Sequence, residues 1–255
     1  TLSVRIDYVA SESPRSDERV VHYSDPAGDD PFAPTQAWAG SEPTRMRPWF
    51  PSWDHPSERM TYTIGLTVPD SLVKQASGQL VQQQNVAPDI RRDVWSVVVA
   101  QPAHRIGFAV GEFALVGDDY VSPVGKRSAL VYAVNPALDS LADAVFSPTP
   151  QIIEVIERRT AVEFPFPEYR QVAVERHGGD GEAMAGLSLF DTSVLRDTRA
   201  LADDTGEAAI MRAAAAQWLG GLVGVADWPE MAILQGIGKT FEWIYFQESG
   251  QPVVA

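Results

Sequence analysis

Near its C-terminal end, the 255-residue chain reads Arg212-Ala213-Ala214-Ala215-Ala216-Gln217-Trp218-Leu219-Gly220-Gly221-Leu222-Val223, an alanine-rich run closed by an aromatic residue and two glycines. Apolar residues recur here at the spacing of one helix face. We therefore predict a helix over 207–222, with Thr205 as its N-cap and a last turn weakened by the two glycines. The predicted apolar face contains Ile210, Ala214, Trp218 and Leu222.

The segments on either side of this run mix strand and helix patterns. Strands are predicted at 130–134, 171–175 and 187–190, where apolar residues alternate or run together. A helix is predicted to start at Thr149, with Thr149 as N-cap and Pro150 at the first helical position. A further helix is predicted over 228–247. Strands that alternate with helices indicate an α/β unit.

The first half of the chain reads as β structure. Apolar and polar residues alternate over 61–68, a β-branched run covers 94–99, and 106–111 alternates again. Residues 1–8 also alternate like a strand. Polar or proline-rich connections are predicted at 11–18, 25–34 and 82–88. We therefore expect two domains, a β-rich one at 1–116 and an α/β one at 117–255, both partial.

The composition limits the kinds of partner. The 34 acidic and 20 basic residues give a net charge of −14, which disfavours direct contact with nucleic-acid phosphates. Without cysteine there is neither a disulfide nor a thiolate metal ligand. No stretch reaches the roughly 20 apolar residues of a membrane span, and the start lacks the pattern of a signal peptide, so no membrane partner is expected. The chain does not begin with Met, and we expect it to be a fragment.

Three segments resemble motifs of the aminopeptidase-N-type zinc peptidases. Residues 47–56, Arg-Pro-Trp-Phe-Pro-Ser-Trp-Asp-His-Pro, resemble the signature Arg-x-x-Phe-Pro-Cys-x-Asp-Glu-Pro, and a strand ending in Val68-Pro69 follows in the same way. Residues 217–223 resemble Gln-Trp-Phe-Gly-Asn-Leu-Val, which follows His-Glu-x-x-His in active enzymes. Residues 233–236 resemble Trp-Leu-Asn-Glu-Gly. The resemblance implies an α+β fold, a β-rich, saddle-like N-terminal domain followed by a truncated thermolysin-like (gluzincin aminopeptidase) α/β domain.

The same resemblance identifies what has become of the zinc site. Arg212 and Ala216 take the positions of the two His ligands, Ala213 that of the general-base Glu, and Gln235 that of the Glu ligand, with the family's interval of 18 residues between Ala216 and Gln235. Alanine has no lone pair to offer a metal, and the arginine is permanently charged. We therefore predict no metal ligand, no catalytic residue and no cofactor, because zinc-activated water is lost.

Two further features concern the former active site. Residues 180–186 match the substrate-binding Gly-Ala-Met-Glu-Asn strand of the active relatives, but no Glu-Asn pair follows Met184, and Glu182 is interpreted as an incidental residue of a strand edge. We hypothesise that the Arg212 guanidinium occupies the former cation cavity and pairs with Glu242. The alternative is an arginine that extends into solvent.

The histidines do not indicate a replacement metal site. None of the four has a ligand partner at helical spacing. The segment around His177 is interpreted as a turn, and Asp54-His55 as a structural loop between prolines rather than a catalytic dyad. The four are His22, His55, His104 and His177.

One branch of this superfamily lacks the zinc site, the family of the second TBP-associated factor, a subunit of transcription factor TFIID. Residues 110–118 resemble its Gly-Pro-Phe-Glu-Ile-Leu-Val-Asp segment, residues 188–195 its Ser-Ile-Phe-Ser-Thr-Asn-Leu-Leu, residues 212–217 its small-residue helix and residues 235–238 its Lys-Gly-Ile-Ser-Gly. Residues 54–56 are closer to the enzymes.

This resemblance implies a non-catalytic scaffold in the nucleus, contributing to preinitiation complex assembly and promoter recognition. Its partners would be other TFIID subunits, with promoter DNA as a further candidate through the complex. Two alternatives stay open: a zinc-type aminopeptidase relative with altered or lost activity, and a free-standing peptide-binding pseudopeptidase.

Overall fold

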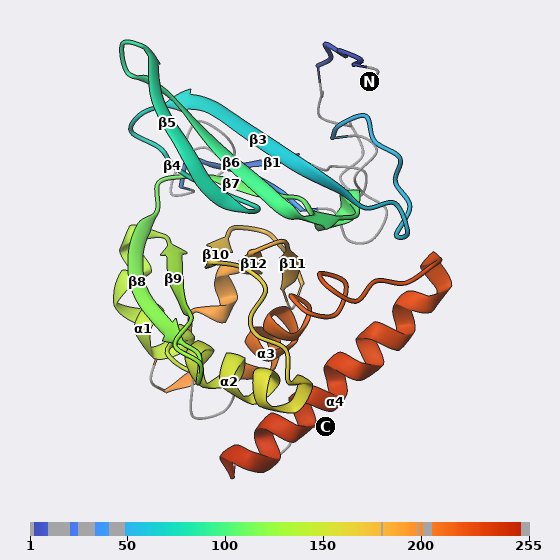
Figure 1. The fold of residues 1–255 in the computed structure, drawn as a ribbon. Coiled ribbons are helices and arrows are strands. Elements are labelled where there is room, and N and C mark those ends of the chain that lie inside the picture. Colours follow the sequence, from blue (N-terminus) through green and yellow to red (C-terminus); the bar gives the residue numbers. More distant parts are fainter. Residues whose placement is uncertain are drawn as a thin grey trace.

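A computed structural model gives the fold of the chain, with a β-rich part stacked on an α/β part (Figure 1). It describes residues 3–9, 21–24, 34–40, 49–179, 181–197, 199–200 and 206–250.

The β-rich part consists of two antiparallel sheets. A 4-stranded sheet has the order β1-β2-β7-β4, and a 3-stranded sheet has the order β3-β6-β5. The alternation predicted for 61–68 forms the half-buried strand β3, paired along its length with β6. The strands are β1 (Val21–Ser24), β2 (Gln36–Ala39), β3 (Met60–Pro69), β4 (Val73–Ala76), β5 (Gln79–Ala87), β6 (Ile90–Gln101) and β7 (Phe108–Gly111).

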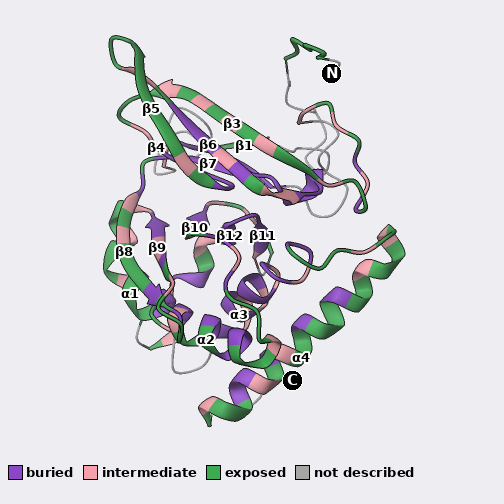
Figure 2. Ribbon diagram, in the orientation of Figure 1, coloured by how far each residue is buried: buried purple, intermediate pink, exposed green. Residues whose placement is uncertain are grey.

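The α/β part is built on a mixed 5-stranded sheet of order β11-β12-β10-β9-β8. Its central strand β10 runs parallel to β9 and β12, while β8 and β11 are antiparallel to their neighbours. β10 and β12 are buried on both faces, which explains their continuous apolar runs in the sequence (Figure 2). The strands are β8 (Ala114–Val121), β9 (Arg127–Val134), β10 (Glu168–Val174), β11 (Glu182–Met184) and β12 (Leu187–Asp191).

Helices cover the face of this sheet that points away from the β-rich part (Figure 1). They are α1 (Asp139–Phe146), α2 (Thr149–Thr160), α3 (Glu207–Ala215) and α4 (Met231–Ser249), with short 3-10 turns η2 (Ala103–Arg105), η3 (Pro136–Leu138), η4 (Thr192–Val194) and η6 (Trp228–Glu230). This arrangement confirms the predicted α+β class.

Three apolar clusters lie between successive layers of the molecule. One lies between the 3-stranded and 4-stranded sheets around Trp95 and Phe108. A second joins the 4-stranded sheet to the 5-stranded sheet through Trp38 and Leu189. The third and largest fills the space between the 5-stranded sheet and the helices. The two parts are therefore packed against each other through a continuous core.

Several local predictions are wrong. The segment predicted as a polar connection at 82–88 belongs instead to strand β5. Nearly every residue of β5 is exposed, so its sequence shows no apolar alternation. Only the backbone hydrogen bonds to β6 define the strand. Described residues 3–9 form neither helix nor strand. Thr149 lies inside α2, and its hydroxyl donates to Gln171 Oε1 at 2.7 Å instead of capping the helix. Thr205 and the loop at 11–18 lie outside the described residues, as does 25–33 of the second loop.

The expected boundary between the two units lies close to the start of strand β8. The position expected from the sequence, 116/117, falls within this strand, which pairs along its whole length with β9 of the α/β sheet. We propose that the second unit begins at β8, after the short connection of Glu112 and Phe113 from β7.

Candidate functional site

Helix α3 is the element on which the candidate site is built. Its sequence, Glu-Ala-Ala-Ile-Met-Arg-Ala-Ala-Ala, is rich in strong helix formers. Ile210 and Met211 are fully buried against the core. The Tyr245 hydroxyl of α4 donates to Glu207 Oε2 at 2.7 Å, in a buried contact that fixes α4 beside the first turn of α3.

The positions that the resemblance assigned to zinc do come together. Arg212 and Ala216 at the end of α3, and Gln235 in α4, line one cavity of about 30 Å³, which has room for about two water molecules. Ala213 is buried, with only 4% of its surface exposed. The spacing read from the sequence therefore corresponds to a real juxtaposition of two helices.

Arg212 makes an ion pair inside this region. Its Nη1 donates to Glu242 Oε2 at 2.8 Å, and Lys239 Nζ lies 3.1 Å from the other oxygen of the same carboxylate. The Arg212 side chain is 24% exposed and that of Glu242 only 8%. The hypothesised pair with Glu242 is confirmed, and the alternative of an arginine that extends into solvent is wrong.

The C-terminal end of α3 is held by donors from the β-rich part. Arg105 Nη2 donates to the Ala216 carbonyl at 2.6 Å, and Gln101 Nε2 to the Gly221 carbonyl at 3.0 Å. The Arg59 guanidinium donates to the Gly220 and Gly221 carbonyls as well. We call these three side chains the carbonyl clamp.

The carbonyl clamp explains why the helix predicted over 207–222 is too long. α3 ends at Ala215, and the chain then turns. Gly220 has a φ of +98°, which favours glycine, and a Cβ there would lie 3.7 Å from the Arg105 guanidinium. The carbonyls of Ala216, Gly220 and Gly221 accept from arginine and glutamine side chains, whereas the Trp218 carbonyl accepts from the Leu222 and Val223 amides. Trp218 is buried as expected, with its Nε1 donating to the Val162 carbonyl.

His104 lies next to the carbonyl clamp. Its ring is 5.0 Å from that of Trp228 and is almost completely buried. Burial, reinforced by the positive charges of Arg105 and Arg59, lowers the pKa of His104 to about 3. The imidazole is therefore neutral at physiological pH.

Two other histidines connect the parts of the molecule. His177 Nε2 lies 3.6 Å from Glu182 Oε2 in β11, and its ring lies 5.2 Å from that of Trp38. The structure assigns a turn to residues 175–176, just before the predicted position, and only a bend at Gly179 within the described residues 177–179. The His177 side chain is buried between Glu182 and Trp38. His55 bonds to Ser57 and lies 3.6 Å from Asp227, in agreement with a structural loop.

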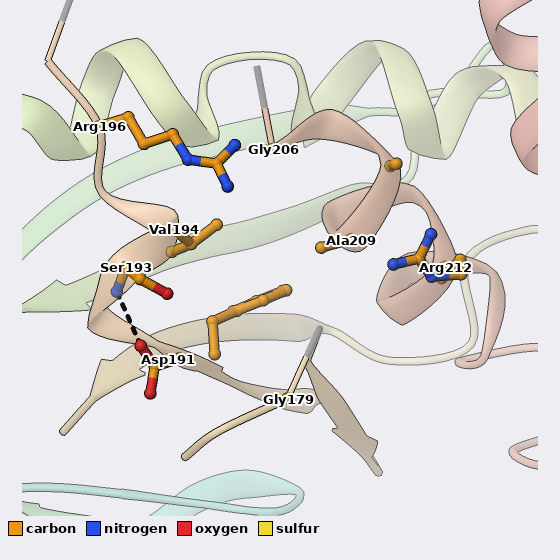
Figure 3. Close-up of a pocket in the computed structure, with 10 residues that line it drawn as sticks. Gly179, Asp191, Ser193, Val194, Arg196, Gly206, Ala209 and Arg212 are labelled. Atoms are coloured by element: carbon orange, nitrogen blue, oxygen red, sulfur yellow. Dashed lines mark hydrogen bonds between the residues drawn. The ribbon is translucent and has the colours of Figure 1, made fainter. Parts of the chain in front are cut away.

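A larger hollow opens at the other end of α3 (Figure 3). It has a volume of about 220 Å³ and lies between α3 and the segment that follows β12. Arg196 and Arg212 contribute guanidinium groups to its wall, and the other lining residues include glycines, which have no side chain, and alanines, which have small ones. No motif or spacing in the sequence indicated Arg59, Arg105 or Arg196, because no local pattern relates these residues to α3.

The residues present do not fit zinc. Zinc in proteins is bound by imidazole, thiolate or carboxylate groups, whereas the three positions around the small cavity carry a guanidinium, a methyl group and an amide. Within the described ranges, no group of three or more histidine and acidic side chains is arranged to hold a metal ion.

Solved structures define the class of fold. Legionella pneumophila aminopeptidase A, solved in complex with aspartic acid, matches 84% of this chain and 26% of its own with a TM-score of 0.74 and 17% identity. An M1 zinc metallopeptidase E323A mutant from Deinococcus radiodurans matches 86% of this chain and 48% of its own, with a TM-score of 0.72 and 21% identity. The chain therefore has the aminopeptidase-like fold that the resemblance implied. No family model matches the chain.

Curated relatives fall into two groups. Human glutamyl aminopeptidase is 24% identical over 80% of this chain and 21% of its own length. TFIID subunit 2 is 26% identical over 74% of this chain in Gallus gallus and 79% in Danio rerio, in each case 16% of the subunit. The chain thus spans 21% of the length of the aminopeptidase and 16% of that of the TFIID subunits, and it is similar to both groups at comparable identity.

Proposed function

We propose that this chain is part of a non-catalytic, aminopeptidase-like scaffold subunit of TFIID. The observation that carries the proposal is the Arg212–Glu242 ion pair beside the cavity where the relatives of this fold would hold zinc. A guanidinium at a ligand position repels a divalent cation, and the neighbouring Ala216 and Gln235 cannot compensate for it.

The comparisons with known proteins support a role in transcription. Subunits of TFIID from three animals are among the relatives, which favours a nuclear protein whose partners are other TFIID subunits. The net charge of −14 favours protein partners, with promoter DNA reached through the complex. Within the described part of the chain, no helix is long and apolar enough to cross a membrane.

The proposal is tested by metal content, turnover and partners together. Elemental analysis of the purified chain is expected to find no stoichiometric zinc, and a panel of aminoacyl-anilides is expected to stay intact, with a glutamyl aminopeptidase as the positive control. Affinity purification from nuclear extract is expected to bring down other TFIID subunits. Stoichiometric zinc with turnover that chelation abolishes would overturn the proposal.

A second candidate is a free-standing pseudopeptidase that binds peptides. The hollow of about 220 Å³ at the start of α3 favours it, because a fold without its metal keeps a shaped surface there. Absence of zinc and turnover without any TFIID subunit in the purification would select this candidate.

A further inference from the structure

Strand β5 forms an exposed edge of the 3-stranded sheet. It pairs with β6 on one side, and no strand among the described residues pairs with its other side. All of its residues except Leu80 are exposed (Figure 2). Figure 1 shows the β5–β6 hairpin extending away from the α/β part, so a second molecule can approach this edge. The backbone groups along it are therefore a template for a further strand.

The sequence of β5 lacks the usual protection of such an edge. Natural proteins place charges or proline on exposed edge strands. β5 reads Gln-Leu-Val-Gln-Gln-Gln-Asn-Val-Ala, without either, although charged residues make up 21% of the whole chain. The opposite edge of the sheet, β3, ends at Pro69, and the Arg92 guanidinium lies over its middle, where a Cβ on Gly65 would be 2.6 Å from Nη2. β5 is thus the less protected of the two edges.

Two irregularities in the pairing with β6 divide β5 into parts. The register shifts once at Val81 and once at Val86, so each valine is an extra residue without a partner opposite it in β6. Both valines are exposed, at 57% and 47%. Between them, residues 82–85 pair without interruption and carry only side-chain amides. The regular part of the free edge is this run of four amides between two exposed valines.

The order of residue types in β5 is the same in both directions. From Leu80 to Ala87 it runs two apolar residues, four amides and two apolar residues. A two-fold axis between Gln83 and Gln84 therefore places each residue opposite one of its own kind, as a self-complementary contact between identical chains requires. The opposed pairs are Leu80 with Ala87, Val81 with Val86, Gln82 with Asn85, and Gln83 with Gln84.

Side-chain amides suit a contact of this kind, because each one both donates and accepts hydrogen bonds. Gln82 Nε2 donates to Gln84 Oε1 at 3.4 Å along the strand, and Gln83 Nε2 donates to Asp93 Oδ2 at 3.1 Å. An amide has two donors and two acceptor lone pairs, so each of these side chains retains capacity for a partner across the edge.

The charge around β5 does not oppose a second copy. Residues 60–101 include all three strands of this sheet and carry three acidic and three basic residues, a net charge of zero, whereas the whole chain has −14. Two copies that meet here therefore keep the negative charge of the rest of each chain away from the contact. The acidic residues are Asp70, Asp89 and Asp93, and the basic ones are Lys74, Arg91 and Arg92.

We propose that two copies of this chain associate through β5, as an antiparallel pair about a two-fold axis between Gln83 and Gln84. The contact joins two 3-stranded sheets into a continuous one. Because the regular run is short, a weak and reversible dimer is expected. Each copy uses its β5 edge in the pair, so association stops at the dimer. The inference depends neither on the loss of the metal site nor on membership of TFIID.

Sedimentation equilibrium of the purified full chain tests the association, over concentrations from about 1 μM to about 1 mM. The average mass is expected to rise from 27.8 kDa toward twice that value. A mass that stays at 27.8 kDa throughout would overturn the inference and leave the edge to an extended segment of another protein. A mass that rises beyond the dimer would indicate open-ended pairing and overturn it as well.

Two matched variants test the register. In Gln82→Glu, Asn85→Glu, like charges stand opposite each other twice in the dimer, and the dissociation constant is expected to rise at least ten-fold. Gln82→Lys, Asn85→Glu places opposite charges at the same two contacts and is expected to dimerise at least as tightly as the parent. In both variants the new glutamate at position 85 faces Arg91 of β6, which favours the β5–β6 hairpin.

Thr63→Glu, Thr67→Glu is the control, with two exposed positions on β3 at the opposite edge of the sheet. It is expected to leave the dimer unchanged, and thermal unfolding checks that every variant is folded. A dimer that survives Gln82→Glu, Asn85→Glu uses another surface. A dimer that is lost in both β5 variants has another register, and either result would overturn the inference.

Discussion

At its C-terminal end, α3 is enclosed by Arg59, Gln101 and Arg105 from the β-rich part, and all three donate to backbone carbonyls. At its N-terminal end, the same helix borders a hollow of about 220 Å³ with guanidinium groups on two sides. At the first end Gln101 and Arg105 are 0% and 3% exposed and Arg59 is half-buried, whereas at the second end Arg196 is half-buried and Ser193 is exposed.

The difference predicts unequal effects on stability for substitutions at the two ends of one helix. At the enclosed end, buried cations satisfy carbonyls that would otherwise lack partners, so substitutions there act on stability. At the open end, Arg196 and Ser193 are less buried, so substitutions there are expected to cost less stability. Arg212 lines both cavities and connects the two ends.

The largest effect is expected from restoring metal ligands at the enclosed end. The triple variant Arg212→His, Ala216→His, Gln235→Glu places two imidazoles and a carboxylate around the cavity that these positions already line. We expect about one zinc ion per chain and at least a ~1,000-fold gain in zinc affinity over the parent, about 4 kcal/mol. Elemental analysis and competition with a coloured chelator measure it.

The matched control moves one ligand to the open end. Arg196→His, Ala216→His, Gln235→Glu has the same residue types, but its first imidazole lies outside the small cavity. A folded triple variant that binds zinc no better than this control would mean that the juxtaposition of α3 and α4 does not preserve a metal geometry.

The next largest effect concerns the carbonyl clamp. Arg105→Ala removes a side chain that is only 3% exposed and leaves the Ala216 carbonyl without its 2.6 Å donor. We expect the free energy of unfolding to fall by about 3 kcal/mol, because a buried partner is lost and a cavity is left. Urea denaturation measures it. Arg127→Ala, at an exposed pair, is the control and is expected to leave the midpoint unchanged; an equal effect of both variants would refute a special role of the clamp.

A pH dependence follows from His104 at the enclosed end. The pKa of His104 is about 3 in the folded chain and about 6.5 when unfolded, so between these values only the unfolded chain binds the proton. Stability is then complete above pH 6.5 and is lost as the pH falls toward 3, by roughly 2 kcal/mol at pH 5 from this residue. Denaturation at several pH values should show a shallower slope in His104→Leu than in the parent. Identical slopes would place the acid sensitivity elsewhere.

The features of the fold that depend on a local sequence pattern could be predicted from the sequence. The alternation over 61–68 and the apolar runs of β10 and β12 follow from burial on one or two faces. The interval between Ala216 and Gln235 predicted that these two residues belong to one site, and both line the same cavity. Strand β5 was missed because an edge exposed on both faces has no apolar signature.

The clamp and the open hollow could not be predicted in this way. Arg105 and Ala216 are 111 positions apart, and Arg59 and Gly220 are 161 apart, so no local spacing relates them. The end of α3 was misplaced for the same reason, because the donors that replace its helical hydrogen bonds come from the other part of the molecule. Glu242 was predicted as the partner of Arg212 because the family resemblance places it on the neighbouring helix.

The smallest effect is expected at the carboxylate that Arg212 shares with Lys239. Glu242→Gln removes the charge that Arg212 and Lys239 share, and we expect a loss of about 1 kcal/mol, since Arg212 is partly exposed and can rehydrate. Glu154→Gln, at an exposed pair with Arg158 on α2, is the control. An equal loss of stability in Glu242→Gln and Glu154→Gln would mean that the carboxylate shared by Arg212 and Lys239 contributes no more than an exposed pair.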